Sequence, residues 1–113
     1  MHEISLCQSV LQVLEEQALA QRFSRVRAVW LEVGILAGVE LEALRFGFDV
    51  VTEGSLAAQA RLEIIEVPAT ARCPRCAKHV SVQRRFDSCP DCGSCQLRLN
   101  GGDELRIKEV EVE

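Results

Sequence analysis

The segment CPRCAKHVSVQRRFDSCPDC, residues 73–92, contains two CPxC pairs separated by twelve residues. Each pair places two thiols on one tight turn, so the two pairs together supply four thiolates in the arrangement that zinc prefers. Four cysteine ligands leave no coordination position for water, which is typical of a structural rather than a catalytic zinc site. The sequence therefore predicts a structural zinc site, and its ligands are Cys73, Cys76, Cys89 and Cys92.

The residues around these cysteines are too polar to form a core of their own. Between residues 69 and 96 the only larger apolar residues are Val80, Val82 and Phe86. A segment shorter than about 40 residues usually needs a metal or disulfides to fold. We therefore expect residues 69–96 to form a zinc-ribbon-like module held by the metal.

The start of the chain shows no basic leader before an apolar stretch, so we expect no secretory signal and a cytoplasmic protein with reduced cysteines.

Outside this module, the apolar periodicity predicts two helices and three strands. The helices are expected over residues 4–21 and 40–52, and the strands over 25–33, 60–67 and 105–112. Strand 25–33 has apolar residues on both faces, as in a well-covered strand, and the apolar phase of 105–112 slips, as in a bulge or an edge strand. We predict an α+β fold: a small three-stranded sheet with two helices, formed by a discontinuous domain of residues 1–68 and 97–113.

Length and composition agree with one globular domain that carries an insertion. The chain has 113 residues, of which 48% are hydrophobic and 27% are charged. No uncharged run approaches the roughly 20 residues that a membrane span requires, so we expect no membrane partner. Of the six cysteines, Cys7 belongs to the apolar stripe of the first helix and is expected in the core.

Charge is unevenly distributed along the chain. The net charge is −4, yet residues 68–98 contain six basic residues and only two acidic ones. Because zinc with four thiolates carries a charge of about −2, the basic side chains are interpreted first as balancing the cluster and second as a surface for an acidic partner. The patch also permits an alternative function, a zinc-ribbon nucleic-acid-binding module, although the acidic remainder and the few aromatic residues argue against it.

Two further residues near the zinc pairs have more than one interpretation. Cys95 extends the second pair to a C-x2-C-x2-C run, and it is either a free thiol or a ligand that can exchange into the site. An enzyme with Cys95 as its nucleophile is a third functional class, but no histidine lies close to it in sequence. His79 is interpreted as a surface residue, with replacement of a cysteine ligand as the minor alternative.

The first residues, Met1, His2 and Glu3, offer a second kind of metal chemistry. A histidine at position 2 is by itself most often a solvated side chain. However, the terminal amine, the His2 amide nitrogen and His2 Nδ1 can chelate one ion in a plane, which suits Cu(II) or Ni(II). The fourth position then lies opposite the His2 amide and is open to the Glu3 carboxylate, water or a residue of another protein. The Glu3 amide would compete with His2 Nδ1 for its place.

Taken together, several motifs resemble the HypA/HybF family of hydrogenase nickel-incorporation proteins. They are Met1-His2-Glu3, the helix that follows, Val33-Gly34, Phe46-Gly47-Phe48 and the two CPxC pairs. The resemblance extends over essentially the whole chain, and Cys95 is the one feature without a place in the family pattern.

This resemblance implies a nickel metallochaperone rather than an enzyme. It implies that Met1, His2 and Glu3 bind Ni2+ as transient cargo, and that the two CPxC pairs hold structural Zn2+. The partners it implies are a HypB-type GTPase and the large subunit precursor of a [NiFe] hydrogenase. We expect a monomer or weak homodimer that binds no nucleic acid.

Overall fold

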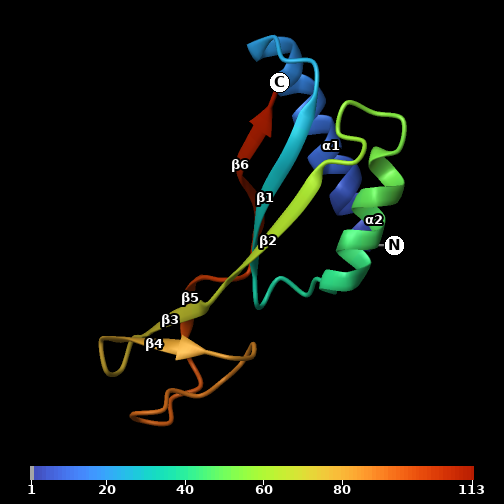
Figure 1. Ribbon diagram of the computed structural model, residues 1–113. Helices are drawn as coiled ribbons and strands as arrows, with labels where there is room; N and C mark the ends of the chain where they lie inside the picture. The colour runs from blue at the N-terminus through green and yellow to red at the C-terminus, as the bar shows by residue number, and fades with distance from the viewer. Residues whose placement is uncertain (1) are drawn as a thin grey trace. The chain divides into compact units, whose positions relative to one another are not determined.

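The computed structural model describes residues 2–113, which contain two helices and six strands (Figure 1). The elements are α1 (His2–Gln21), β1 (Val26–Gly34), α2 (Leu41–Thr52), β2 (Arg61–Val67), β3 (Ala69–Cys73), β4 (Lys78–Val82), β5 (Arg98–Gly101) and β6 (Leu105–Val112). The strands form two three-stranded sheets, one in the order β2-β1-β6 and the other in the order β4-β3-β5. The α+β fold class predicted from the sequence is confirmed.

All five elements predicted outside the cysteine-rich segment are present, with ends that differ by at most two residues. β1 lies in the middle of its sheet and is buried over most of its length, as its apolar residues on both faces predict. β6 lies at an edge of the same sheet, which agrees with its broken apolar alternation. The sequence patterns do not reveal β3, β4 and β5, because these strands have only four or five residues each.

The contacts divide the chain into two compact units. The first contains the residues up to Leu31, Val39–Ile65 and Ile107–Glu113, and the second contains Glu32–Gly38 and Glu66–Arg106. The segment 69–96, which the sequence marks as a metal-held module, lies within the second unit.

In the first unit, α1 and α2 pack against each other and lie on the same side of the β2-β1-β6 sheet (Figure 1). Gly47 permits this close packing, because a Cβ atom there would lie 3.0 Å from Ile4 Cδ1 and 3.3 Å from Cys7 Sγ. The Cys7 thiol donates a hydrogen bond to the Leu44 carbonyl at 3.4 Å, which joins the two helices again at the same level. Cys7 is thus a core residue, as its place in the apolar stripe predicts.

In the second unit, β3 is the central strand of the β4-β3-β5 sheet. One face of this sheet covers a small core, whose buried members are Leu36, Ala69, Ala71, Cys73, Val80, Val82 and Cys89. Gly34 and Gly102 meet backbone to backbone beside this core, and a Cβ atom on Gly34 would collide with the carbonyl group of Gly102. Glycine is therefore required at position 34 by space.

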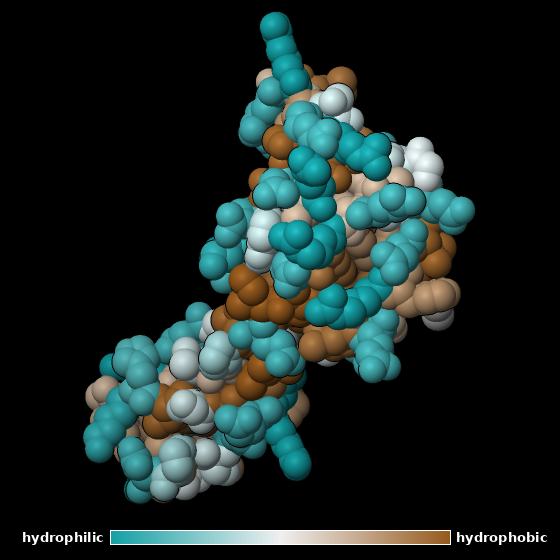
Figure 2. Space-filling model, in the orientation of Figure 1, coloured by the Kyte–Doolittle hydropathy of each residue, from teal (hydrophilic) through white to brown (hydrophobic). Residues whose placement is uncertain are grey.

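Hydrophilic side chains cover most of the face shown in Figure 2. Among the described residues, the most exposed large apolar side chains are Phe86 at 96%, Leu19 at 85% and Phe46 at 68%. Neither described helix is long and apolar enough to cross a membrane.

Candidate metal centres

The two CPxC pairs of the second unit adopt the same local conformation. Ala77 N donates to the Cys73 carbonyl, and Gly93 N donates to the Cys89 carbonyl, both at 2.8 Å. Ala77 and Gly93 also share a left-handed backbone, with φ of 56° and 76°. In each pair the proline at the second position fixes φ in the turn, so the chain reverses and returns the second cysteine toward the first. The repeated pattern in sequence is therefore a repeated turn in structure.

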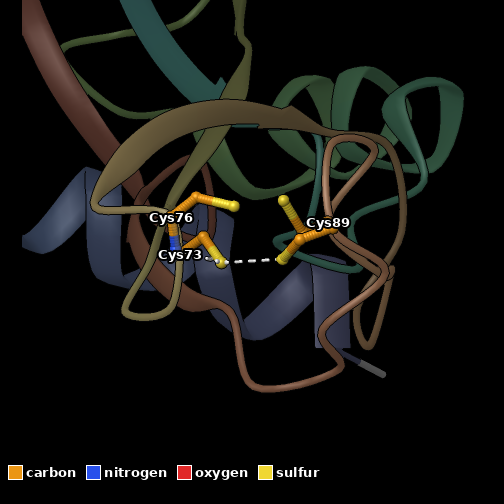
Figure 3. A group of neighbouring side chains, drawn as sticks. Cys73, Cys76 and Cys89 are labelled. Carbon is orange, nitrogen blue, oxygen red and sulfur yellow. Dashed lines mark hydrogen bonds between the residues drawn. The ribbon is translucent and has the colours of Figure 1, made fainter.

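These turns bring four sulfur atoms together. The Sγ atoms of the four CPxC cysteines all lie within 4.8 Å of one another, and Cys73 Sγ lies 3.6 Å from Cys92 Sγ. Zinc–sulfur bonds of about 2.3 Å in a tetrahedron place the sulfurs roughly 3.8 Å apart, so this cluster has the size that zinc requires. Figure 3 shows the labelled side chains of Cys73, Cys76 and Cys89 directed toward a common centre, and its dashed line marks the Cys73–Cys92 contact.

Within the first CPxC pair, the surroundings favour the thiolate form of Cys73 over that of Cys76. The backbone N–H of Cys76 donates to Cys73 Sγ at 3.4 Å, and this hydrogen bond lowers the pKa of the Cys73 thiol to about 7. The neighbouring Cys92 thiol and burial raise the pKa of Cys76 to about 12. Sulfur atoms this close cannot all carry negative charge without a cation between them. The donor set and its spacing therefore fit zinc, which deprotonates its thiol ligands.

Cys95 and His79 lie outside this group of sulfurs. Cys95 is exposed, with its Sγ 3.5 Å from Ser88 Oγ. His79 Nδ1 lies 2.8 Å from Asn100 Nδ2. All six cysteines, each of which is within the described part of the chain, are free of disulfides.

The second predicted site lies at the amino-terminal end of α1, in the first unit. Met1 lies outside the described residues. The His2 side chain is 57% exposed, and its Nδ1 lies 3.5 Å from Glu3 Oε2. Since α1 begins at His2, the backbone N–H groups of His2 and Glu3 belong to the first turn, where no helical carbonyl is available to them. The structure thus places an exposed imidazole, a carboxylate and the His2 amide side by side, while the Glu3 amide donates to the Glu3 carboxylate.

The structure adds a contact that the sequence does not reveal. Glu3 Oε2 accepts a hydrogen bond from Glu40 N at 3.2 Å, which holds the pKa of the Glu3 carboxyl below its ordinary value. Glu40 is itself the N-cap of α2, where its carboxylate accepts from Glu42 N and Ala43 N at 3.3 and 2.8 Å. Glutamate is not among the preferred N-cap residues, so no sequence signal distinguishes Glu40. The start of α1 is thereby tied to the start of α2.

Comparison with known proteins gives a consistent result. A family model described as "Hydrogenase/urease nickel incorporation, metallochaperone, hypA" matches residues 1–112. The hydrogenase maturation factor HypA of Alkalilimnicola ehrlichii is 63% identical to this chain, and that of Azotobacter vinelandii is 58% identical, each over 113 residues and the full length of both chains.

Solved structures show the same fold. The solution structure of the Ni metallochaperone HypA from Helicobacter pylori matches with a TM-score of 0.72 at 21% identity, covering 97% of this chain and 96% of that chain. A second solution structure, of a HypA protein, matches with a TM-score of 0.75 at 22% identity and covers 100% and 97% of the two chains. The chain belongs to the HypA family of nickel-incorporation metallochaperones, which act in hydrogenase maturation.

Proposed function

We propose that this chain binds Ni(II) at its amino terminus and delivers it to the large subunit precursor of a [NiFe] hydrogenase. The observation that carries the proposal is the arrangement at the start of α1, where the exposed His2 imidazole lies 3.5 Å from the Glu3 carboxylate. The helix leaves its first amide groups without helical partners, so a metal can take the His2 amide nitrogen without breaking a helical hydrogen bond.

The proposed nickel ligands are the amine of Met1, the amide nitrogen of His2 and His2 Nδ1. In this chelate the amine and Nδ1 are trans, so the fourth position lies beside Nδ1. Adjacent donors in a square plane lie about 3 Å apart, and Glu3 Oε2 is already 3.5 Å from Nδ1. This proximity supports the Glu3 carboxylate as the fourth donor over water or a residue of another protein.

An open site of this kind suits a carrier. The His2 ring is exposed, so a partner's ligands can approach the metal while it is still bound. Amide nitrogen must lose its proton to bind nickel, so we expect nickel to leave this site as the pH falls. Persistence of nickel bound to the amide nitrogen at about pH 6 would contradict this part of the proposal.

We further propose that Cys73, Cys76, Cys89 and Cys92 hold a structural zinc ion. When bound, the ion supplies the charge that lets four thiolates share one small core. In this proposal the ion organises residues 69–96, while residues 1–68 and 97–113 form the nickel-binding domain. Four thiolate ligands leave no position for a substrate, so the proposed function is binding and transfer without catalysis.

The proposed partners are the large subunit precursor and a HypB-type GTPase. The proposed location is the cytoplasm, where cysteines stay reduced and where nickel would be inserted into the precursor. As a monomer or weak homodimer, the chain keeps its amino terminus accessible to both partners.

The deciding experiment is a nickel titration of the untagged, zinc-loaded full chain, followed by X-ray absorption spectroscopy. Two changed chains run beside it: His2→Ala, and a chain extended by one glycine before Met1. His79→Ala is the matched control, because it removes the other histidine of the chain. We expect both amino-terminal changes to abolish stoichiometric nickel binding while zinc stays bound and the control behaves as the unchanged chain.

Two results would contradict the nickel site. One is equal nickel binding by all four chains, which would place the site elsewhere. The other is a nickel spectrum with two trans amide nitrogens and no imidazole, which would replace His2 Nδ1 by the Glu3 amide.

A further inference from the structure

The exposed face of the β4-β3-β5 sheet concentrates positive charge. Along β3 the buried residues alternate with the exposed residues Thr70 and Arg72. The strand pairing places Arg72 directly opposite His79 of β4 on one side and Arg98 of β5 on the other. All three residues are exposed, so they form one row across the sheet.

The two arginines of this row have no carboxylate partner. Within residues 2–113, neither Arg72 nor Arg98 takes part in an ion pair. Elsewhere in the same unit, Lys78 Nζ lies 3.8 Å from an Asp91 carboxylate oxygen. Like charges directly opposite each other on neighbouring strands destabilise a sheet. The facing pair of arginines therefore lowers the stability of the β4-β3-β5 sheet, which favours a role in binding rather than in folding.

Balancing the zinc cluster does not account for this row. Neighbouring residues in a strand point to opposite faces of the sheet. Cys73 is fully buried in the core beneath the sheet, whereas Arg72 is on the exposed face. The Arg72 guanidinium is thus on the wrong side of the sheet to donate hydrogen bonds to the thiolates.

A bulge in β5 adds a further polar group to the row. The β3–β5 register shifts between Thr70 and Ala71, so that Asn100 is the extra residue between Leu99 and Gly101. Bulges re-aim side chains, and Asn100 Nδ2 lies 2.8 Å from His79 Nδ1 across the central strand. With the amide donating, His79 Nδ1 accepts and the ring proton remains on Nε2. The imidazole then offers a donor in line with the two guanidinium groups.

We propose that this arginine face, formed by Arg72, His79, Arg98 and Asn100, binds an acidic segment of a partner protein. Guanidinium groups hold carboxylates through paired hydrogen bonds. A single small anion gains little from exposed charges in water, whereas a protein segment brings several carboxylates and excludes water from the contact. The four residues include no Phe, Tyr or Trp on which a base could stack, and the chain is acidic overall, so a nucleic acid fits less well.

The test measures binding of a fluorescein-labelled peptide of about eight glutamates to the zinc-loaded full chain at low salt, by fluorescence anisotropy. The test variant is Arg72→Gln with Arg98→Gln. The matched control is Arg25→Gln with Lys108→Gln, which changes the net charge equally at exposed residues of the first unit. We expect the test variant to bind the peptide about tenfold more weakly, and the control less than about twofold, with zinc content unchanged in both.

A second variant separates binding from folding. Arg98→Glu places a carboxylate directly opposite Arg72, so we expect a higher unfolding temperature together with loss of peptide binding. A variant that is more stable yet does not bind cannot owe its loss of binding to unfolding. Residues 1–3 are unchanged in every variant, so nickel titration is unaffected and this inference is tested apart from the proposed function.

Three results would overturn the proposal. The first is absence of saturable peptide binding by the unchanged chain. The second is equal weakening in the test and control variants, which would reduce the effect to net charge. The third is tighter binding of an oligothymidylate of matched charge with the same dependence on Arg72 and Arg98, which would make a nucleic acid the occupant.

Discussion

The two candidate metal sites differ in how completely the protein surrounds the ion. The four cysteines of the second unit lie within 4.8 Å of one another, and Cys73 and Cys89 are buried. The amino-terminal site is exposed at His2, and its proposed ligands come from the first residues of one helix. A closed set of soft ligands retains its metal, whereas an open set of nitrogen and oxygen donors exchanges it. In the proposed function, this difference separates a metal that stabilises the fold from a metal that is carried.

The largest expected effect follows from removing one ligand of the four-cysteine site. In Cys73→Ser we expect zinc to be lost and amide protection in β3 to disappear, because structural zinc stabilises such modules by about 10 kcal/mol. Zinc content and hydrogen exchange measure the two effects. Cys95→Ser is the control and should keep its zinc, since Cys95 is exposed and outside the sulfur group. Full zinc occupancy in Cys73→Ser would indicate that Cys95 exchanges into the site.

The next largest effect is a loss of stability at high pH caused by Cys7, a thiol that binds no metal in the proposed function. Burial raises the pKa of Cys7 from 9.0 to about 11, so the folded first unit favours the neutral thiol. The neutral Cys7 thiol therefore makes its full contribution to the free energy of unfolding below about pH 9. This contribution is lost as the pH rises toward 11, by up to about 2 kcal/mol. Urea unfolding followed by the fluorescence of Trp30, the single tryptophan, measures this loss. Cys7→Ala should reduce the slope by the contribution of this thiol, and an unchanged slope in that variant would assign it to another group.

A smaller effect is expected on nickel affinity at the amino-terminal site. Glu3→Gln removes the carboxylate beside His2 Nδ1, so we expect nickel affinity to fall about tenfold, because one charged donor is lost. Calorimetric titration measures the change. Glu15→Gln, on an exposed face of the same helix, is the control of equal charge. Equal affinities in the two variants would indicate that the fourth donor is water or comes from another protein.

The smallest expected effect is the change in stability caused by backbone strain in the two cysteine turns. A Cβ atom at Gly93 would meet open space, so Gly93→Ala tests backbone strain alone. We expect it to destabilise the second unit by about 1 kcal/mol, because a left-handed backbone disfavours any residue with a Cβ. Ala77→Gly is the mirror experiment and should not destabilise, since Ala77 already has φ of 56°. Thermal unfolding of the zinc-loaded chains gives both values, and equal destabilisation by the two changes would contradict the strain argument.

Much of the fold can be predicted from local pattern. The five longer elements follow from apolar periodicity, because helices and half-buried strands repeat with fixed spacings. The four-cysteine group follows from the CPxC spacing, because each pair lies on one turn whose geometry is set by neighbouring residues. The short strands β3, β4 and β5 escape prediction, since four or five residues give too little periodicity to distinguish a strand from a loop.

The contacts that complete each site escape prediction for a different reason. Glu3 meets Glu40 N across 37 positions of the sequence, and His79 meets Asn100 across 21. Neither pair has a spacing that a helix or strand period would connect. Such contacts arise only when separate elements pack together.

The sequence by itself determined the α+β fold class, the main helices and strands, and the grouping of cysteines into two pairs. Each of these depends on periodicity or turn geometry, which neighbouring residues set among themselves. Only the tertiary structure decided that Cys95 lies outside the predicted four-cysteine group, that the Glu3 carboxylate accepts a hydrogen bond from the start of α2, and that Arg72 and Arg98 lie side by side. Those arrangements depend on strand pairing and helix packing between distant residues, whose partners a one-dimensional pattern does not specify.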